Sequence, residues 1–476
     1  MTATATTLRT PRMSGARVIG DVVRHGLGVD SPIVRGIPGE DIACFRFNRR
    51  TVYVLKHPDH VDHVLHGGVD RYHKSVEYEM LRAAVGLSLF TDEEESWRQH
   101  RMMINPVLAK RHLQDLFDLM VDPIERFVAR YEADPSPRQP IEMTHAMTEL
   151  TLDVVGSALF GRGMADLARR IGSRVTLGLR GSERAARVIL ATNPPVPLVR
   201  LAVAIIQRVS FLPPPINQLH DVLTTIDRTV WGVIEERRRT PGRDDDLLGL
   251  LLSIRDEDGR PLPLRRVRDE ACTFMLAGHE TTANALAWMW HLLAINQEAR
   301  ARMLAEVDEV LGDRRPTFED VRRLPWTTAC AMEAMRLFSP AWIVPRVCVA
   351  DDEIGGHRIP KGSVVIIPVN ELHHDERFWP DPEVFDPTRF LPGHGRDRHR
   401  CAYLPFGGGR RVCAGQSFAL IEMALITAMM SRSFTYELLP GHPIAREATM
   451  TIRPRYGMPM VARRRRPVAA PEAVAA

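Results

Sequence analysis

The chain has 476 residues, of which 45% are hydrophobic and 26% charged, and its net charge is only +4. This composition is typical of a soluble globular protein, and so small a basic excess gives no argument for nucleic-acid binding. The six cysteines are scattered with no pair at metal-clip spacing, which indicates a reducing, cytoplasmic compartment without disulfides. The N-terminal segment contains no long apolar run, so we expect neither a signal peptide nor a transmembrane anchor.

The first predicted elements are short. Residues 42 to 55 alternate in the manner of two strands around a polar turn at 48–50, and a helical stretch follows from Pro58 to His66. The region after it is mixed and ends in the apolar run Leu87 to Phe90. For any single residue of that run, simple core filling is at least as good an interpretation as a functional one.

Trp97 and Arg101 stand four residues apart, so on a helix they share one face. An indole N–H donor beside a guanidinium suits a carboxylate ligand. The pattern is weak on its own, because this pairing is common. His100 lies between them and is expected to be exposed.

The stretch from residue 198 to 215, LVRLAVAIIQRVSFLPPP, is strongly apolar. It has two interpretations of equal weight: a buried helix, or an exposed lip for an apolar substrate or a membrane surface. The basic run Arg237 to Arg239 is expected to be a solvated helix end.

One long helix is predicted from Leu264 to Ile295, apolar nearly all round and therefore buried through a large domain. It is interrupted by the polar sequence AGHETT, Ala277 to Thr282. Gly278 and the threonines favour a kink or a groove. Glu280 beside Thr281 in an apolar helix is costly unless the pair functions or is hydrogen-bonded.

The next helix is predicted over residues 326 to 338, where Glu333 and Arg336 are three apart and meet on one face. Strands follow, including Val364 to Ile367. The run His373-His374-Asp375 is not interpreted as a zinc site with Cys401, because no repeated ligand-pair spacing supports it.

The sequence FGGGRRVCAG, Phe406 to Gly415, precedes another apolar helical stretch. Its three consecutive glycines allow the backbone to approach a large group closely. Cys413 stands at the N-terminus of the following helix, where the dipole and free N–H groups stabilise a thiolate, the form that ligates metals. The competing interpretation is a buried structural cysteine.

The spacing of this segment resembles the heme-binding signature of the cytochrome P-450 family, Phe-x-x-Gly-x-Arg-x-Cys-x-Gly. All five fixed positions match: Phe406, Gly409, Arg411, Cys413 and Gly415. The AGHETT sequence resembles the family's oxygen-binding signature, and Trp97/Arg101 and Glu333/Arg336 resemble its Trp-x-x-x-Arg and Glu-x-x-Arg motifs.

The resemblance covers roughly residues 30 to 460. It implies a mainly α fold with small β-sheets, a long central helix and a cysteine-ligand loop. We expect an N-terminal extension over residues 1–28, one heme domain over 29–461, and a disordered tail over 462–476. For the tail, contact with an anionic surface is the alternative.

The resemblance also implies roles for individual residues. Cys413 is the proximal ligand of the iron of heme b, Thr281 hydrogen-bonds dioxygen, and Glu280 belongs to the proton-delivery path. The remaining heme contacts implied are Trp97, Arg101, Arg346, Arg411, Phe406, Gly409, Gly415, Ala277 and Gly278. A structural cluster of Glu333, Arg336 and Arg389 is implied, and a substrate-facing wall of Leu276, Trp342, Ile343 and Val344.

The function implied is a monooxygenase that inserts one oxygen atom of dioxygen into a hydrophobic substrate. No flavin or nicotinamide fingerprint follows Cys413, so electrons are expected from NAD(P)H through a ferredoxin and a ferredoxin reductase. A peroxygenase or isomerase, and a non-enzymatic gas sensor, are the alternatives. The Glu280–Thr281 pair favours the monooxygenase, because family peroxygenases lack it.

By the resemblance, the apolar run Leu87 to Phe90 belongs to the loop that forms the roof of the substrate pocket. The apolar wall and this roof, with no unpaired arginine or lysine evident in them, favour a hydrophobic substrate. The AGHETT sequence resembles the fatty-acid hydroxylating branches of the family. A long-chain fatty acid or related lipid is therefore expected ahead of a steroid or terpenoid. Biosynthesis of one secondary metabolite is the alternative.

Overall fold

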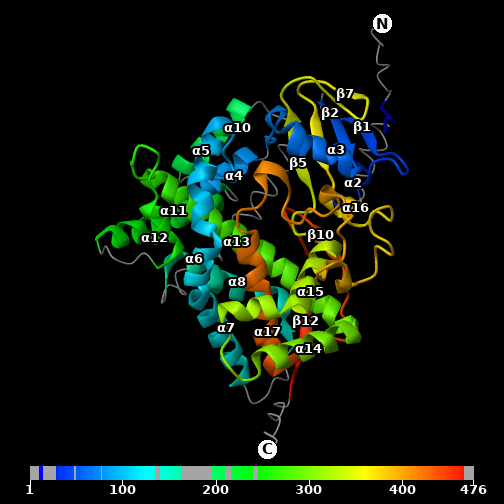
Figure 1. Ribbon diagram of the computed structural model, residues 1–476. Coiled ribbons are helices and arrows are strands. Elements are labelled where there is room, and N and C mark those ends of the chain that lie inside the picture. Colours follow the sequence, from blue (N-terminus) through cyan, green and yellow to red (C-terminus); the bar gives the residue numbers. More distant parts are fainter. Residues whose placement is uncertain are drawn as a thin grey trace, which may run out of the picture.

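The computed structural model describes residues 10–13, 28–29, 31–47, 50–76, 78–133, 140–161, 196–209, 216–239 and 245–465. A large helical body lies beside a smaller region of sheet (Figure 1). The fold is mainly α with small sheets, as the resemblance implies.

The helical body is built around one long helix, and the other helices are of ordinary length. The helices are α2 (Pro32–Arg35), α3 (Pro58–Asp62), α4 (Tyr78–Val85), α5 (Glu94–Ile104), α6 (Lys110–Asp115), α7 (Phe117–Glu132), α8 (Met143–Phe160), α10 (Val196–Arg208), α11 (Ile216–Arg239), α12 (Leu247–Ser253), α13 (Leu264–Ile295), α14 (Gln297–Leu311), α15 (Pro325–Leu337), α16 (Val369–His373) and α17 (Gln416–Ser433). None of the helices in the described part of the chain is long and apolar enough to cross a membrane.

The strands are short, because each sheet covers only one edge of the helical body. They are β1 (Ile42–Phe47), β2 (Arg50–Leu55), β3 (Tyr72–His73), β4 (Ile141–Glu142), β5 (Val344–Cys348), β6 (Asp352–Ile354), β7 (His357–Ile359), β8 (Val364–Ile367), β9 (Phe434–Leu438), β10 (Arg446–Ala448), β11 (Ile452–Pro454) and β12 (Pro459–Arg464). The largest sheet has the order β1-β2-β8-β5-β3, and β2 runs parallel to β8 with Val52 opposite Val364. The predicted strand pair and the strand Val364–Ile367 are confirmed.

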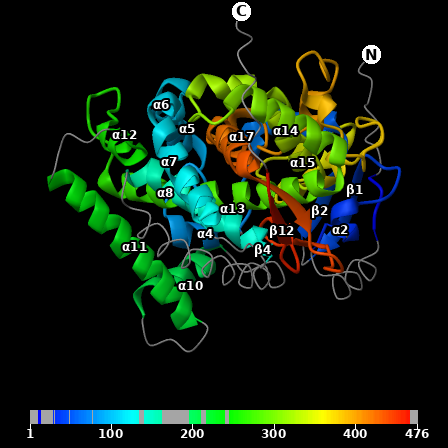
Figure 2. The same ribbon diagram turned by 90° about the horizontal axis from the view of Figure 1, so that it is seen from below.

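Helix α13 crosses the middle of the molecule in both views (Figures 1 and 2). Most of its apolar residues are buried, including Met275 and Met289, because neighbouring elements cover most of its surface; Ala277 and Ile295 are exposed. The helix is continuous from Leu264 to Ile295. Gly278 lies against α8, where an added Cβ would come within 2.7 Å of Val155 Cγ2, so the glycine lets the two helices approach closely.

Helix α15 has clear sequence boundaries. Pro325 occupies its first turn, where the missing N–H costs nothing, and the helix ends at Leu337, before Ser339-Pro340. The predicted helix over residues 326 to 338 is therefore confirmed to within one residue.

Helices α10 and α11 decide two questions of exposure that the sequence raised. Leu198, Leu201 and Ile205 of α10 are 56%, 57% and 44% exposed while Val199 is buried, so this helix is exposed along one face; residues 210–215 of the same stretch lie outside the described residues. Of the basic run at the end of α11, Arg238 and Arg239 are exposed as expected, whereas Arg237 bonds the buried carboxylate of Asp246.

The C-terminal boundary also shifts. Strand β12 pairs with β9 through Arg464, opposite Phe434, and the Arg465 amide donates to the Ser433 carbonyl. The chain is therefore ordered beyond residue 461, where the tail was expected to begin. Residues 466–476 lie outside the described residues.

Candidate active site

The cysteine loop is a tight turn whose backbone path requires glycine. The Cys413 amide donates to the Phe406 carbonyl at 2.9 Å, and the Val412 amide to the Gly409 carbonyl at 3.2 Å. Gly409 has a φ of 67°, and a Cβ there would overlap the Leu65 carbonyl. Gly415 then caps the N-terminus of α17. These constraints fix where the sulfur of Cys413 is presented.

Cys413 differs from the other five cysteines, which are all buried, because its side chain is accessible. Enclosure by the surrounding protein nevertheless raises the pKa of its thiol, while the Gly415 N–H and the Arg101 charge oppose that rise. The side chain is thus accessible, and the surrounding protein still disfavours its ionised form. A bound metal cation would complete the stabilisation of its thiolate.

The polar interruption in α13 supplies a second accessible surface within the core. Ala277 is exposed and Glu280 and Thr281 are half-buried, although Met275 and Thr282 beside them are buried. Thr281 Oγ1 donates to the Ala277 carbonyl at 2.7 Å, one turn earlier on the same helix. Glu280 Oε1 accepts from Thr451 Oγ1 at 3.1 Å, so the acid is held by the residue just before β11.

Three arginines gather near the cysteine loop, as the resemblance implies for propionate binding. Arg101 donates to the Val412 carbonyl at 2.9 Å, one residue before Cys413. The Arg411 guanidinium lies over the Trp97 ring, 4.3 Å from its centroid, and pairs with Glu93. Trp97 and Arg101 share one face of α5, and both lie beside the cysteine loop as predicted.

Arg346 is buried, and its only hydrogen bond in the described part of the chain goes to the Pro345 carbonyl at 2.9 Å. Lys74, which the sequence analysis missed, lies in the same group. Burial, then the charge of Arg411, lowers the pKa of Lys74 to about 7, and Arg346 contributes in the same direction. This crowding of cations beside an accessible thiol fits a heme with two anionic propionates. Lys74 lies far from the other motifs in sequence, so spacing gave no signal for it.

His100 corrects an expectation, because it is buried rather than exposed. Neither ring nitrogen has a hydrogen-bond partner, and Nε2 lies 3.5 Å from Glu270 Oε1. Burial, with help from the Arg266 charge, lowers the pKa of His100 to about 4, and burial raises the pKa of Glu270 to about 8. At neutral pH the contact is therefore between two neutral groups.

The predicted structural cluster is present. Glu333 and Arg336 are fully buried and form a bidentate pair, with Nε and Nη2 each 2.8 Å from a carboxylate oxygen, and Arg389 Nε lies 3.5 Å from Glu333 Oε1. Arg336 Nη1 also donates to the His373 carbonyl, and His373 Nε2 accepts from the Leu404 amide at 2.8 Å. The ion pair is thereby connected to the backbone just before Phe406.

The expected substrate wall divides into two parts. Ile343 and Val344 are half-buried, and Leu276 is 8% exposed. Trp342 is packed in the main core, with its indole N–H donating to the Thr449 carbonyl at 2.9 Å. Its position favours a structural role over substrate contact.

A further trio, Asp62, His66 and Cys401, brings one ligand atom from each residue within 4.8 Å of the others. Arg400 already occupies the Asp62 carboxylate, with Nη2 to Oδ2 at 2.7 Å. Burial raises the pKa of the Cys401 thiol to about 12. A protonated thiol and a neutralised carboxylate are poor metal ligands, so Cys413 suits a metal far better than Cys401.

Comparison with known proteins agrees with this site. The family model described as cytochrome P-450 matches residues 39–457. Cytochrome P-450 132 of Mycobacterium tuberculosis is 46% identical over 97% of this chain and 100% of that protein. Cyclooctatin synthase of Streptomyces melanosporofaciens is 33% identical over 87% of this chain and 86% of its own length.

A solved structure gives the same result. The crystal structure of the cytochrome P-450DA heme domain superposes with a TM-score of 0.80 and 26% identity, covering 96% of this chain and 97% of that one. The chain belongs to the cytochrome P-450 family and is a heme-dependent monooxygenase.

Proposed function

We propose that the protein hydroxylates a lipid-like substrate at a heme held by Cys413. The observation that carries the assignment of the ligand is that Cys413 alone of the six cysteines is accessible. It lies in a glycine-shaped loop beside Arg101. Heme, when bound, supplies the redox chemistry that activates dioxygen. The protein itself contributes binding, positioning and proton transfer.

Arg101, Arg346 and Arg411 are proposed to bind the heme propionates, and we add Lys74 as a fourth cation. Guanidinium groups match carboxylates in bidentate geometry, and the mutual repulsion of Lys74, Arg346 and Arg411 is relieved when anions bind among them. The low pKa of Lys74 reflects its burial first and the charges of Arg411 and Arg346 second, so a carboxylate bound beside it should raise that pKa.

Thr281 and Glu280 are proposed to move protons. The Thr281 hydroxyl now donates to the Ala277 carbonyl and can rotate about χ1 to offer its proton toward the accessible side of α13. Glu280 is held through Thr451, which accepts in turn from Asn284 Nδ2 at 3.1 Å. Such a chain keeps the acid beside the alcohol, ready to replace the proton that the alcohol gives up.

A hydrophobic substrate is supported by the apolar groups near this surface, Leu276, Ile343 and Val344. A long-chain fatty acid or related lipid is our first choice. A terpenoid is the second, because two relatives at 33% and 31% identity are named cyclooctatin synthase and cyclooctat-9-en-7-ol 5-monooxygenase.

Electrons are proposed to come from NAD(P)H through a ferredoxin and its reductase. Arg410, in the cysteine loop, is 56% exposed, and Arg400 nearby is 63% exposed. Arg410 lies 3.8 Å from Asp70 and Arg400 pairs with Asp62, so this surface carries both signs of charge, and the proposal is supported by the family's usual reliance on separate redox partners.

Two measurements test the proposal. The reduced, CO-bound protein should show the red-shifted Soret band of thiolate ligation. A panel of lipids, steroids and terpenes should then be titrated while the low-spin to high-spin shift is followed. If fatty acids of every length leave the spectrum unchanged while a steroid or terpene shifts it, the lipid preference is wrong.

A further inference from the structure

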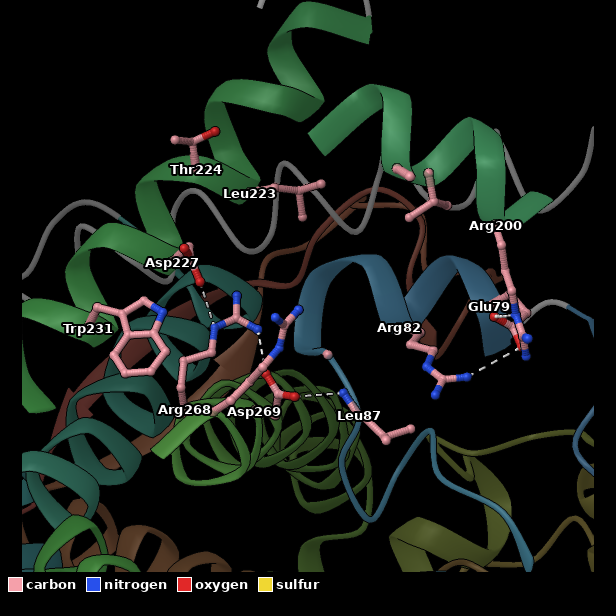
Figure 3. A pocket seen from close by; sticks show the side chains of 14 residues that line it. Glu79, Arg82, Leu87, Arg200, Leu223, Thr224, Asp227, Trp231, Arg268 and Asp269 are labelled. Carbon is pink, nitrogen blue, oxygen red and sulfur yellow. Dashed lines mark hydrogen bonds and ion pairs between the residues drawn. The ribbon is translucent and has the colours of Figure 1, made fainter. Parts of the chain in front are cut away.

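A charged cavity of about 700 Å³ lies at the N-terminal end of α13, apart from the site just described. It is enclosed by α4, α10, α11 and the first turns of α13 (Figure 3). Figure 2 shows α10 and α11 at the outer edge of the helical body, so the cavity lies toward the surface. Nothing in the motifs indicated it, because its residues come from four separate elements.

We infer that this cavity binds the anionic head group of an amphipathic substrate, in particular a carboxylate. The inference rests on the proposed function and narrows its substrate class. Four arginines and three carboxylates line the cavity, so its formal charge is positive. The four arginines are Arg82, Arg200, Arg265 and Arg268, and the acids are Glu79, Asp227 and Asp269.

Two of the arginines are already neutralised. Arg200 forms a bidentate pair with Glu79, at 2.9 and 2.7 Å. Arg268 Nε lies 2.8 Å from Asp227 and its Nη1 lies 2.9 Å from Asp269, as Figure 3 shows. These pairs build the wall of the cavity and are not available to a ligand.

The other two arginines carry the excess positive charge. Among the described residues, Arg82 pairs only with Glu79, at 3.7 Å, and Arg200 already holds that carboxylate. Arg265 is exposed and makes no ion pair with any carboxylate in the described part of the chain. A guanidinium offers parallel N–H donors to a planar carboxylate, so these two side chains suit an acid head group.

The rest of the cavity is apolar, which selects an amphipathic acid over a small anion. Leu87, Leu223 and Trp231 contribute apolar surface to it. Val203 and Ala204, on the same face of α10 as Arg200, add further apolar surface to the cavity. The apolar part of an amphipathic ligand can therefore lie against these residues.

The position of the cavity also constrains the length of the substrate. Thr281 lies twelve residues beyond Asp269 on α13, which at the helical rise is about 18 Å. A molecule whose head group is held here must be long to present a carbon near Thr281. The site thus favours a long-chain acid oxidised far from its carboxylate, over a compact terpene.

The floor of the cavity is joined to the roof of the active site. Asp269 accepts from the Leu87 amide at 2.8 Å, and Gly86, with a φ of 72°, has no room for a Cβ beside that carboxylate. Because Arg268 shares the same carboxylate, the paired arginine is a positioning residue for the roof. It should not be changed in a test of head-group binding.

The test uses the heme-loaded protein with three matched probes: hexadecanoic acid, hexadecan-1-ol and methyl hexadecanoate. Dissociation constants are measured by the spin-state shift and independently by calorimetry. We expect the wild type to bind the acid about 10-fold more tightly than the alcohol, as for a charge-assisted hydrogen bond. The double variant Arg82→Gln/Arg265→Gln should lose that preference while binding the alcohol unchanged.

The matched control is Arg322→Gln, an exposed arginine that contacts only Glu319, away from the cavity. It should bind all three probes as the wild type does, and an unchanged CO-bound spectrum shows that each variant is folded. Equal binding of acid and alcohol by the wild type, or an acid preference that survives in the double variant, would overturn the inference. If the alcohol and ester bind and are hydroxylated in that case, the proposed function still stands. If no C16 probe binds while a terpene does, both fail.

Discussion

Two buried carboxyls, Glu333 behind the cysteine loop and Glu270 beneath the roof, show opposite ways of holding a loop. Both are fully buried. Glu333 has a bidentate partner in Arg336 and a second cation in Arg389. Glu270 has no cation in contact among the described residues: its Oε1 accepts from the Leu89 amide at 2.6 Å, and Nε2 of the neutral His100 lies 3.5 Å from the same oxygen.

The different partners of Glu333 and Glu270 match what each loop has to do. The Glu333–Arg336 ion pair holds its loop rigidly, since removing either partner leaves an unpaired charge in the core. Burial raises the pKa of Glu270 to about 8, so it holds the roof as a neutral acid near physiological pH. Burial raises the pKa of Glu333 as well, but there the charges of Arg336 and Arg389 oppose the rise, whereas no cation contacts Glu270 among the described residues. A loop that presents a metal ligand has to stay still, and one that covers a substrate has to open.

The largest effect is expected from Cys413, which lies in the loop that the Glu333–Arg336 pair supports. Cys413→Ser should abolish thiolate ligation, because an alcohol does not ionise at neutral pH, and the red-shifted Soret band of the reduced CO complex should disappear. Cys401→Ser is the matched control and should keep the band, since burial holds that thiol protonated. A Cys413→Ser protein that retains the band would show that the ligand lies elsewhere.

The next largest effect is expected at Thr281, on the accessible face of α13 beneath the roof. Thr281→Ala should uncouple NAD(P)H consumption from product, with peroxide released, because the proton donor is lost. General acid–base help is worth about 10²- to 10⁴-fold, so the ratio of product to NAD(P)H should fall steeply. Thr282→Ala is the control at the neighbouring, buried position. Unchanged coupling in Thr281→Ala would remove this residue from the mechanism.

Breaking the Glu333–Arg336 ion pair should destabilise the fold. Glu333→Gln leaves Arg336 buried without a counter-charge, which costs about 3–5 kcal/mol in the free energy of unfolding. Urea denaturation followed by heme absorbance measures it. The surface variant Arg322→Gln, which breaks an exposed pair, should cost less than about 1 kcal/mol. Equal losses in the two variants would contradict the role of Glu333.

The smallest effect is expected from Glu270, which holds the roof through the Leu89 amide. A carboxyl whose folded pKa lies above its unfolded pKa binds more protons in the folded state, so it makes stability fall as pH rises between the two values. Here that window runs from the ordinary pKa of a glutamic acid, 4.5, to about 8. Glu270→Gln keeps the acceptor for Leu89 and cannot titrate, so its stability should fall less steeply across this window.

The control for that comparison is Asp351→Asn, a solvent-facing acid whose pKa is lowered by the Lys361 amide and Arg358, and which should leave this window unchanged. Thermal unfolding at several pH values between 4.5 and 8 measures both variants. Parallel curves for the wild type and Glu270→Gln would mean that Glu270 stays ionised in the folded protein.

Local patterns in the sequence were sufficient for the elements and for the cysteine loop. The helix Leu264–Ile295 follows from its apolar residues, and the loop before Cys413 from its glycines, because backbone conformation depends chiefly on neighbouring residues. The Glu333–Arg336 pair could also be predicted, since residues three apart on a helix meet.

The tertiary structure alone decided which charges are buried and which are left over. His100 was expected to be exposed and is buried, because its neighbour Glu270 lies on a helix 170 residues further along the chain. Lys74 joins Arg346 and Arg411, and Arg82 faces the first turns of α13, by the same kind of long-range packing. Whether a side chain is buried, and whether its charge is balanced, depends on contributions from distant segments. The spacing of residues along the chain therefore cannot predict either.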